Sequence, residues 1–146
     1  MKLSTRGIYA LRILSQLALH YGEAPLSVAE LSRREDISAK YLEQVIAILR
    51  KRGLLVSTRG KQGGYALRKS PEQITLGEIV RSVDGPLAPI PCASITAPFV
   101  CTDGPYEYES CWIRHLMLRV RDNISAILDQ ETLADMIKDV ARSKRV

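Results

Sequence analysis

The hydrophobic positions between residues 27 and 52 repeat with the period of an α-helix, in two segments separated by a short polar turn. The second segment, residues 38–52, places four apolar side chains on one face at about 100° per residue: Leu42, Val45, Ile46 and Leu49. Ser27 and Ser38 stand at the starts of the two segments, and a serine there can cap a helix by accepting a hydrogen bond from a free backbone amide. The pattern predicts a helix, a turn and a second helix.

The opposite face of the second helix is polar and mostly carries long side chains. It collects Lys40, Glu43, Gln44, Ala47 and Lys51. Amide, carboxylate and amine groups on one exposed helix face can pair with base edges and phosphates in the major groove of DNA. The same pattern also fits an ordinary solvated surface helix, so the face alone does not decide between the two interpretations.

Two short runs of apolar and β-branched residues follow, LLVST and YALRK, joined by the basic, glycine-rich stretch RGKQGG. This pattern is typical of a β-hairpin. Gly60, Gly63 and Gly64 permit the positive φ angles of a tight loop. Arg59 and Lys61 place positive charge at its tip, where it can contact phosphate or the minor groove. A hairpin directly after a helix–turn–helix predicts a winged helix–turn–helix, a combination more specific than either part.

Four more helices are expected around this unit. The first runs from Thr5 to about Tyr21, with Ser4 or Thr5 as its cap and Tyr21 at the end of its apolar arc. A short helix starts at Thr75 after the hairpin. Ser110 is expected to cap a long helix, and a last helix follows it. The predicted fold class is therefore mainly α with a small β-hairpin wing.

The segment before the long helix, residues 84–109, shows neither helical nor strand periodicity and is rich in proline, so a long irregular loop is expected. Loops of this length in compact proteins are usually functional or disordered. We therefore predict three parts: a winged helix–turn–helix DNA-binding domain at 1–83, a cysteine-bearing sensor loop at 84–109, and a dimerisation helix with a C-terminal helix at 110–146.

The long helix carries one continuous apolar stripe, made of Ile113, Leu116, Met117, Val120, Ile124, Ile127 and Leu128. Such a stripe can form a coiled-coil-like seam with a second copy of the chain, or it can pack inside its own subunit. The sequence pattern favours neither alternative over the other.

Charge is divided unevenly along the 146 residues. Residues 1–70 contain 13 Lys and Arg against 5 Asp and Glu, whereas residues 71–146 contain 8 against 11. A positive field on the half with the helix–turn–helix is expected of a phosphate-binding surface. Charged and polar residues at Arg6, Arg12 and Gln16 interrupt the first apolar segment, so neither a signal peptide nor a membrane span fits, and a cytoplasmic location is expected.

Three cysteines, Cys92, Cys101 and Cys111, lie in the loop and at the start of the long helix. An odd number in a reducing compartment favours metal, redox or inert roles over a disulfide framework. Thiolates suit iron–sulfur clusters, zinc and copper(I), and His115, one helical turn after Cys111, is a candidate fourth ligand. The spacing of the cysteines matches no standard zinc-binding or ferredoxin motif. No P-loop, dinucleotide fingerprint or nucleophile elbow is present, so an enzyme is not expected.

The chain as a whole resembles the bacterial iron–sulfur cluster regulator family of winged-helix transcription factors, which includes IscR and NsrR. The resemblance rests on MKLSTRGIYALR, SAKYLEQVIAILRKRGLLVSTRGKQGGYALR, ITLGEIVRSVDG and the three cysteines before a long helix. It implies a homodimer that reads a pseudo-palindromic operator in double-stranded DNA. The DNA contacts it implies are Ser38, Lys40, Tyr41, Glu43, Gln44, Arg59 and the glycine wing.

The resemblance also implies an iron–sulfur cluster on Cys92, Cys101 and Cys111, with 2Fe–2S favoured over 4Fe–4S. Two features differ from the family pattern. The cysteines here are more widely spaced, and Arg114 stands where the family has a histidine ligand, with His115 one residue further. Some relatives lack a cluster and sense through thiols or a protein partner. The sequence therefore predicts a cluster-sensing regulator of transcription, with a cluster-free repressor as the alternative and an electron carrier as a remoter one.

Overall fold

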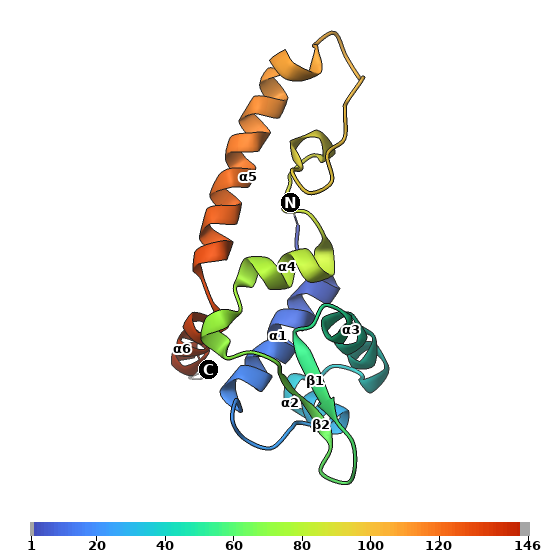
Figure 1. The fold of residues 1–146 in the computed structure, drawn as a ribbon, viewed down its shortest axis with the longest axis vertical. Helices are drawn as coiled ribbons and strands as arrows, with labels where there is room; N and C mark the ends of the chain where they lie inside the picture. The colour runs from blue at the N-terminus through green and yellow to red at the C-terminus, as the bar shows by residue number, and fades with distance from the viewer. Residues whose placement is uncertain (1, 144–146) are drawn as a thin grey trace.

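The computed structural model describes residues 2–143 and is mainly α-helical, with one small β-hairpin (Figure 1). The elements in chain order are α1 (Thr5–Leu19), α2 (Val28–Glu35), α3 (Ala39–Lys51), β1 (Leu55–Thr58), β2 (Gly64–Leu67), α4 (Leu76–Asp84), α5 (Trp112–Gln130) and α6 (Leu133–Ser143). Three single 3-10 turns lie between them: η1 (Pro71–Gln73), η2 (Pro91–Ala93) and η3 (Tyr108–Ser110). The predicted fold class, mainly α with a hairpin wing, is confirmed.

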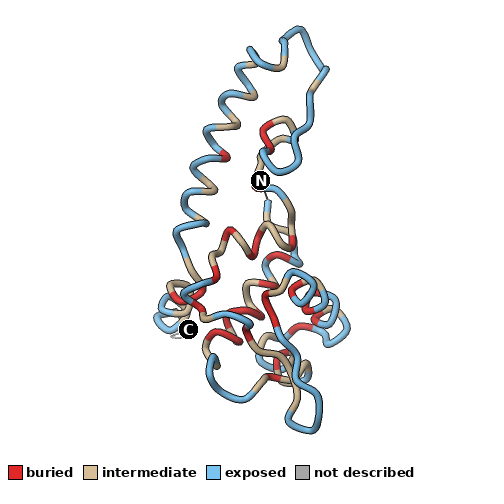
Figure 2. Tube along the Cα trace, viewed as in Figure 1, coloured by how far each residue is buried: buried red, intermediate tan, exposed pale blue. Residues whose placement is uncertain are grey.

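One hydrophobic core holds α1, α2, α3, the hairpin, α4 and α6 together. Leu14, Leu42, Ile79 and Leu133 are fully buried in it, although they come from four different helices. In Figure 2 the buried residues gather in this body, whereas α5 and the loop beside it are largely exposed. The stability of the fold therefore resides mainly in the part that contains the helix–turn–helix.

Local capping explains where four of the helices begin. The hydroxyl groups of Ser4, Ser27, Ser38 and Thr75 each accept a hydrogen bond from the backbone amide three residues on, at 2.9–3.3 Å. Each bond satisfies an amide that has no partner inside its own helix. The predicted caps at these positions are confirmed.

Two expected boundaries differ in the structure. Helix α1 ends at Leu19, and Tyr21 lies beyond it with 49% of its surface exposed, so Tyr21 is not part of the buried arc. Ser110 belongs to η3, and Cys111 occupies the N-cap position of α5 without a side-chain cap bond. The first amides of α5 thus lack a side-chain cap, unlike those of α1 to α4.

Helix α6 returns to the core instead of continuing the long helix. It packs against α1 and η1, and Leu133 at its start is fully buried. The Leu76 amide donates to Glu131 O, and the Leu133 amide donates to Ile74 O, both at 2.9 Å. These two bonds attach the end of α5 to the start of α4, so the long helix is fixed to the winged-helix body at its C-terminal end.

Helix α5 extends away from that body, and the loop from α4 runs back along it before entering its N-terminus (Figure 1). The hairpin lies at the opposite end of the molecule, with Leu55 paired to Leu67 and Thr58 to Gly64. This arrangement places the loop cysteines and the hairpin tip at opposite ends of the molecule.

Candidate nucleic-acid interface and cysteine site

Helix α3 presents the face that the sequence assigns to DNA. Lys40, Glu43, Gln44, Ala47 and Lys51 are all exposed, whereas the apolar face of the same helix is buried in the core. Asp36 adopts a left-handed conformation with φ of 52° and ends α2, which sets the turn into α3. The polar face is thus presented on a helix whose other side is fixed by packing.

Two residues implied to contact DNA have other partners in this structure. The Ser38 hydroxyl accepts the Tyr41 amide at 3.3 Å, so its cap role occupies one of its hydrogen-bonding positions. The Tyr41 ring is half-buried and packs edge-on against Tyr9 of α1, with ring centroids 5.3 Å apart. The Tyr41 ring is therefore in contact with α1, and only part of the side chain faces solvent.

The hairpin tip carries the expected exposed charge. Arg59, Gly60 and Lys61 are exposed, and Gly60 has φ of 110°. Gly63 does not have a positive φ angle, so the prediction that a positive φ explains the glycine at this position was wrong. A Cβ at Gly63 would instead overlap Thr58 O, and one at Gly64 would overlap Leu26 O. These glycines allow close approach of backbone to backbone at the base of the wing.

Two basic grooves flank β1 and were not predicted from the sequence. One, of about 540 Å³, lies between α3 and the hairpin and is lined by Ala47, Arg50, Lys51, Leu55, Val56, Ser57 and Arg68. The other, of about 370 Å³, is lined by Ser27, Val28, Arg50, Ser57, Thr58, Arg59, Gly64 and Tyr65. Arg50 and Ser57 are common to both. The positions of Arg50 and Arg68 depend on how α3 packs against the hairpin, which local periodicity does not specify.

The three cysteines lie together at the far end of the molecule. All are half-buried, and all line one cavity of about 340 Å³. Its other lining residues are Ile90, Asp103, Gly104, Pro105, Tyr106, Tyr108, Ile113 and Arg114. The loop and the first turn of α5 thus bring side chains from positions 92, 101 and 111 to one mostly apolar site.

His115 and Arg114 have different surroundings. His115 is exposed, is not in the cavity lining, and its Nε2 lies 2.8 Å from Glu109 O. Arg114 lines the cavity, donates from Nε to Cys92 O at 3.1 Å, and places its guanidinium 4.0 Å from the Tyr108 ring centroid. The structure therefore puts a cation, and not the imidazole, next to the thiols.

The donor set of this cavity suits an iron–sulfur cluster in chemical type. Three thiols at one site are the soft ligands that such clusters require. Within residues 2–143, no three His, Cys, Asp or Glu side chains converge closely enough to hold a single metal ion. An iron–sulfur cluster distributes its protein ligands over more than one iron atom, so three thiols around one cavity fit it better than they fit a mononuclear zinc site.

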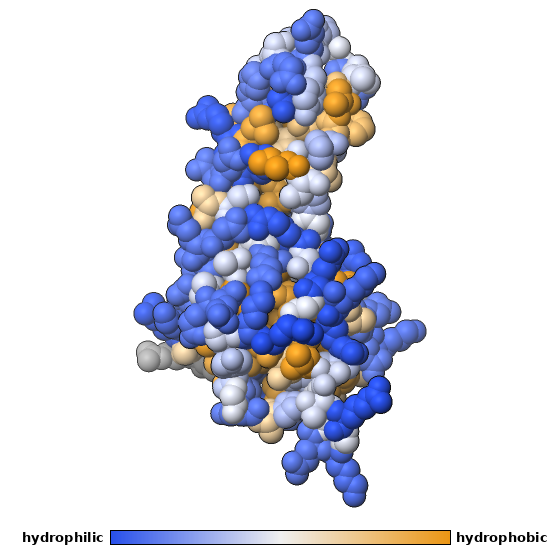
Figure 3. All heavy atoms as spheres, in the orientation of Figure 1, coloured by the Kyte–Doolittle hydropathy of each residue, from blue (hydrophilic) through white to orange (hydrophobic). Residues whose placement is uncertain are grey.

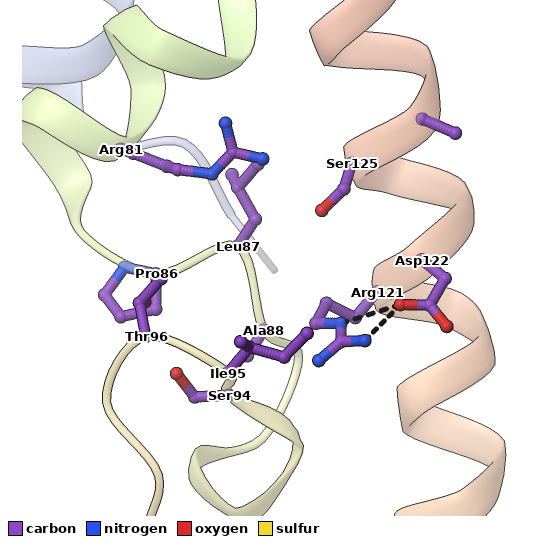
Figure 4. Close-up of a pocket in the computed structure, with 11 residues that line it drawn as sticks. Arg81, Pro86, Leu87, Ala88, Ser94, Ile95, Thr96, Arg121, Asp122 and Ser125 are labelled. Carbon is purple, nitrogen blue, oxygen red and sulfur yellow. Dashed lines mark hydrogen bonds and ion pairs between the residues drawn. The ribbon is translucent and has the colours of Figure 1, made fainter.

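Two further arginines join the loop and α4 to α5. Arg121 is the buried charged residue of α5, and it donates from Nη1 to Ala93 O at 3.3 Å and pairs with Asp122. Figure 4 shows Arg81 and Arg121 on opposite sides of a second cavity of about 420 Å³, which lies between α4, the loop and α5. Arg81 also forms a bidentate pair with Asp129, at 2.7 and 2.8 Å.

The Arg81 pair changes the acidity of its partner. Hydrogen bonding to Arg81 lowers the pKa of Asp129 from its ordinary value, against a smaller opposing effect of burial. A Cβ at Gly77 would overlap Asp129 Oδ1 and lie 2.8 Å from Arg81 Nη1, so this glycine makes room for the pair. The connection between α4 and α5 thus depends on three residues from two helices.

Within the described residues, none of the helices is both long enough and apolar enough to cross a lipid bilayer.

Comparison with known proteins agrees with this architecture. Residues 3–139 match the family described as "Rrf2: Iron-dependent Transcriptional regulator". The chain is 38% identical to the HTH-type transcriptional regulator CymR of Bacillus subtilis over 93% of this chain and 89% of CymR. It is 34% identical to the HTH-type transcriptional regulator IscR of Erwinia tasmaniensis, over 95% of this chain and 80% of IscR.

Solved structures give the same result. The solved structure of CymR, "the Global Cysteine Regulator of B. subtilis", superposes with a TM-score of 0.78 at 36% identity, covering 94% of this chain and 97% of that one. T. potens IscR superposes with a TM-score of 0.76 at 34% identity, covering all of this chain and 93% of the other. These relatives are named as regulators of transcription and not as enzymes.

Proposed function

We propose that this protein, which belongs to the Rrf2 family of transcriptional regulators, is a cytoplasmic repressor whose DNA binding depends on an iron–sulfur cluster. Cys92, Cys101 and Cys111 would hold the cluster, of the 2Fe–2S type. The observation that carries this proposal is that three thiols far apart in the sequence line one cavity beside α5. The family description as iron-dependent supports the same assignment.

DNA recognition is proposed for the exposed face of α3 and for the wing. Gln44 and Glu43 are the candidates for base edges in the major groove, because amide and carboxylate groups match adenine and cytosine there. Lys40, Lys51, Arg59, Lys61 and the wing glycines Gly60, Gly63 and Gly64 are assigned to phosphate or minor-groove contacts, with Ser38 and Tyr41 at the edge of the surface. Arg50, which lines both basic grooves, is added to this set.

A homodimer is proposed through α5. The residues Ile113, Val120 and Ile127 recur at seven-residue spacing, and they expose 41%, 37% and 63% of their surfaces. In Figure 3, hydrophobic side chains reach the surface in the half of the molecule that contains α5 and the loop. A heptad stripe that stays exposed within the described residues fits pairing with a second copy. Two recognition helices related by a two-fold axis would read a pseudo-palindromic operator.

The signal is proposed to travel along α5. Arg114 and Arg121 bond the backbone carbonyl groups of Cys92 and Ala93, so the loop is fixed to α5 beside the thiols. At the other end of the helix, the pair between Arg81 and Asp129 fixes α5 to α4 of the winged-helix body. A change at the cysteines that moves the loop would therefore displace α5 relative to α3. Only a difference in DNA affinity between the two arrangements makes this a switch.

The alternative is a cluster-free regulator whose thiols or protein partner carry the signal. It is favoured by one observation: the three cysteines are free and half-buried, without converging on a point that would hold a single metal ion. The likeness to a protein titled as a cysteine regulator agrees with it.

Operator binding of the wild type and the Cys101→Ala variant distinguishes the two functions. Sites would first be selected from a random duplex library, which should return pseudo-palindromes if the protein binds as a symmetric dimer. Affinity is then measured by fluorescence anisotropy on anaerobically reconstituted and metal-free protein. The cluster proposal expects the two wild-type forms to differ and Cys101→Ala to behave as metal-free protein in both preparations. Equal affinities of all forms would refute it.

A further inference from the structure

The cysteine cavity contains one residue with a carboxylate side chain. Asp103 is part of its lining, together with the three cysteines, and the lining includes no histidine. Three thiols leave a four-ligand 2Fe–2S cluster one ligand short. A fourth ligand from this chain has to come from a residue that reaches the same cavity.

The two neighbouring candidates on α5 do not meet that requirement. The Nε2 atom of His115 lies 2.8 Å from Glu109 O and thus faces a backbone carbonyl outside the cavity. Arg114 does line the cavity, but a guanidinium is always protonated and offers no lone pair to a metal. Its hydrogen bond to Cys92 O also shows that it serves to hold the loop.

The backbone of the loop places Asp103 in the cavity lining, two residues after Cys101. Gly104 follows with φ of 85°, a conformation that reverses the chain and that other residues rarely adopt. Cys101 Sγ contacts Asp103 O at 4.0 Å, so both residues belong to one tight turn. None of the ion pairs recorded within residues 2–143 involves Asp103. Asp103 is exposed at the surface of this turn.

Resting on the proposed function, we infer that Asp103, and not His115, is the fourth ligand of the cluster. A carboxylate adds a negative charge that a neutral imidazole would not, and the Arg114 guanidinium beside the cavity offsets part of that charge. The ligand set would thus be three thiolates and one carboxylate, all from residues 92–111 of a single chain.

This ligand set implies which of the four ligands is released first. A carboxylate is a harder ligand than a thiolate and is less suited to iron–sulfur iron, so its position is the most readily exchanged of the four. Cys92 is tied to Arg114, and Cys111 is at the N-cap of α5, so both are attached to the helix. Asp103 and Cys101 lie on the free turn of the loop. Release of Asp103 would therefore free that turn first.

The test uses full-length protein reconstituted anaerobically with iron and sulfide, in four forms: wild type, Asp103→Ala, Asp103→Cys and His115→Ala. Iron and sulfide are counted per chain, visible absorption and circular dichroism are recorded, and the reduced protein is examined by electron paramagnetic resonance. The rate of bleaching in air measures how firmly the cluster is held. Far-ultraviolet circular dichroism confirms that each variant is folded.

We expect Asp103→Ala to retain several-fold less iron, or to bleach several-fold faster, than wild type. Asp103→Cys should retain the cluster, with absorption and resonance spectra shifted towards those of an all-thiolate site. His115→Ala should match wild type. Loss of the cluster in His115→Ala with retention in Asp103→Ala would overturn the inference and leave the proposed function standing. A wild-type protein that takes up no iron or sulfide would overturn the proposed function, and this inference with it.

Discussion

The exposed stripe of α5 gives the most direct structural prediction, because its contribution to dimer stability can be estimated from burial. Leu116 and Val120 expose 41% and 37% of their surfaces in the single chain. Fully burying one such side chain contributes about 1.5–3 kcal/mol. If pairing of two α5 helices covers what is now exposed, the two residues together contribute about 1–2 kcal/mol per protomer.

Symmetry doubles this figure. In a two-fold interface each residue is used once by each copy, so the pair contributes about 2–4 kcal/mol per dimer. The double substitution Leu116→Ala with Val120→Ala should therefore raise the dimer dissociation constant by roughly 30- to 700-fold. Analytical ultracentrifugation over a concentration series measures this change directly.

Val56 provides a matched control. It is a valine with the same exposure, 37%, but it lies on β1 of the hairpin and not on α5. Val56→Ala should leave the dissociation constant unchanged. An unchanged constant in the α5 double variant, with native circular dichroism, would refute the assignment of α5 as the dimer seam and would require another surface.

Three further predictions concern the wing and the junction between α4 and α5. Arg59→Ala should weaken operator binding and reduce its dependence on salt concentration, because losing a phosphate contact reduces the number of counterions released on binding. Any cluster spectrum should stay the same. An unchanged affinity for the operator would show that the wing is not part of the interface. Gly77→Ala should lower the midpoint of urea unfolding, although alanine normally favours a helix, because its Cβ would overlap Asp129. A second change, Asp129→Ala, should then restore part of the loss, and no recovery would contradict the steric reason. The pKa of Asp129 is lower in the folded protein than its ordinary value of 3.8. The ion pair with Arg81 therefore contributes its full stabilisation above pH 3.8 and loses it as the pH falls through the lower pKa of the folded state. Below that pH, acid should reduce the free energy of unfolding less in Asp129→Asn than in the wild type. Parallel acid-unfolding curves for the two proteins would contradict this prediction.

Much of the fold follows from local sequence features. The caps at Ser27, Ser38 and Thr75 and the buried face of α3 are set by residues close together in the chain, and periodicity with capping chemistry predicts them. The same local rules placed a cap at Ser110, where the chain instead forms a 3-10 turn and α5 begins without a side-chain cap. A serine before an apolar run is a sign of a helix start, but it does not specify how the preceding loop approaches.

What the sequence could not predict depends on contacts between distant segments. The pattern of α6 indicates an amphipathic helix, but not that Leu133 packs into the core against α1. The pairing of Arg81 with Asp129 joins residues 48 positions apart, and neither residue differs locally from other surface charges. His115 and Asp103 show the same limit: helical spacing made the histidine a candidate ligand, whereas the cavity lining includes Asp103 and not His115.

The central claim is that Cys92, Cys101 and Cys111 hold an iron–sulfur cluster, and anaerobic purification followed by absorption spectroscopy with iron and sulfide analysis tests it most directly. The account predicts brown protein with visible charge-transfer bands and matching amounts of iron and sulfide, both lost when Cys101 is replaced by alanine. Protein that stays colourless and free of iron and sulfide after reconstitution would contradict the claim. The cysteines would then act as thiols or have no role in sensing.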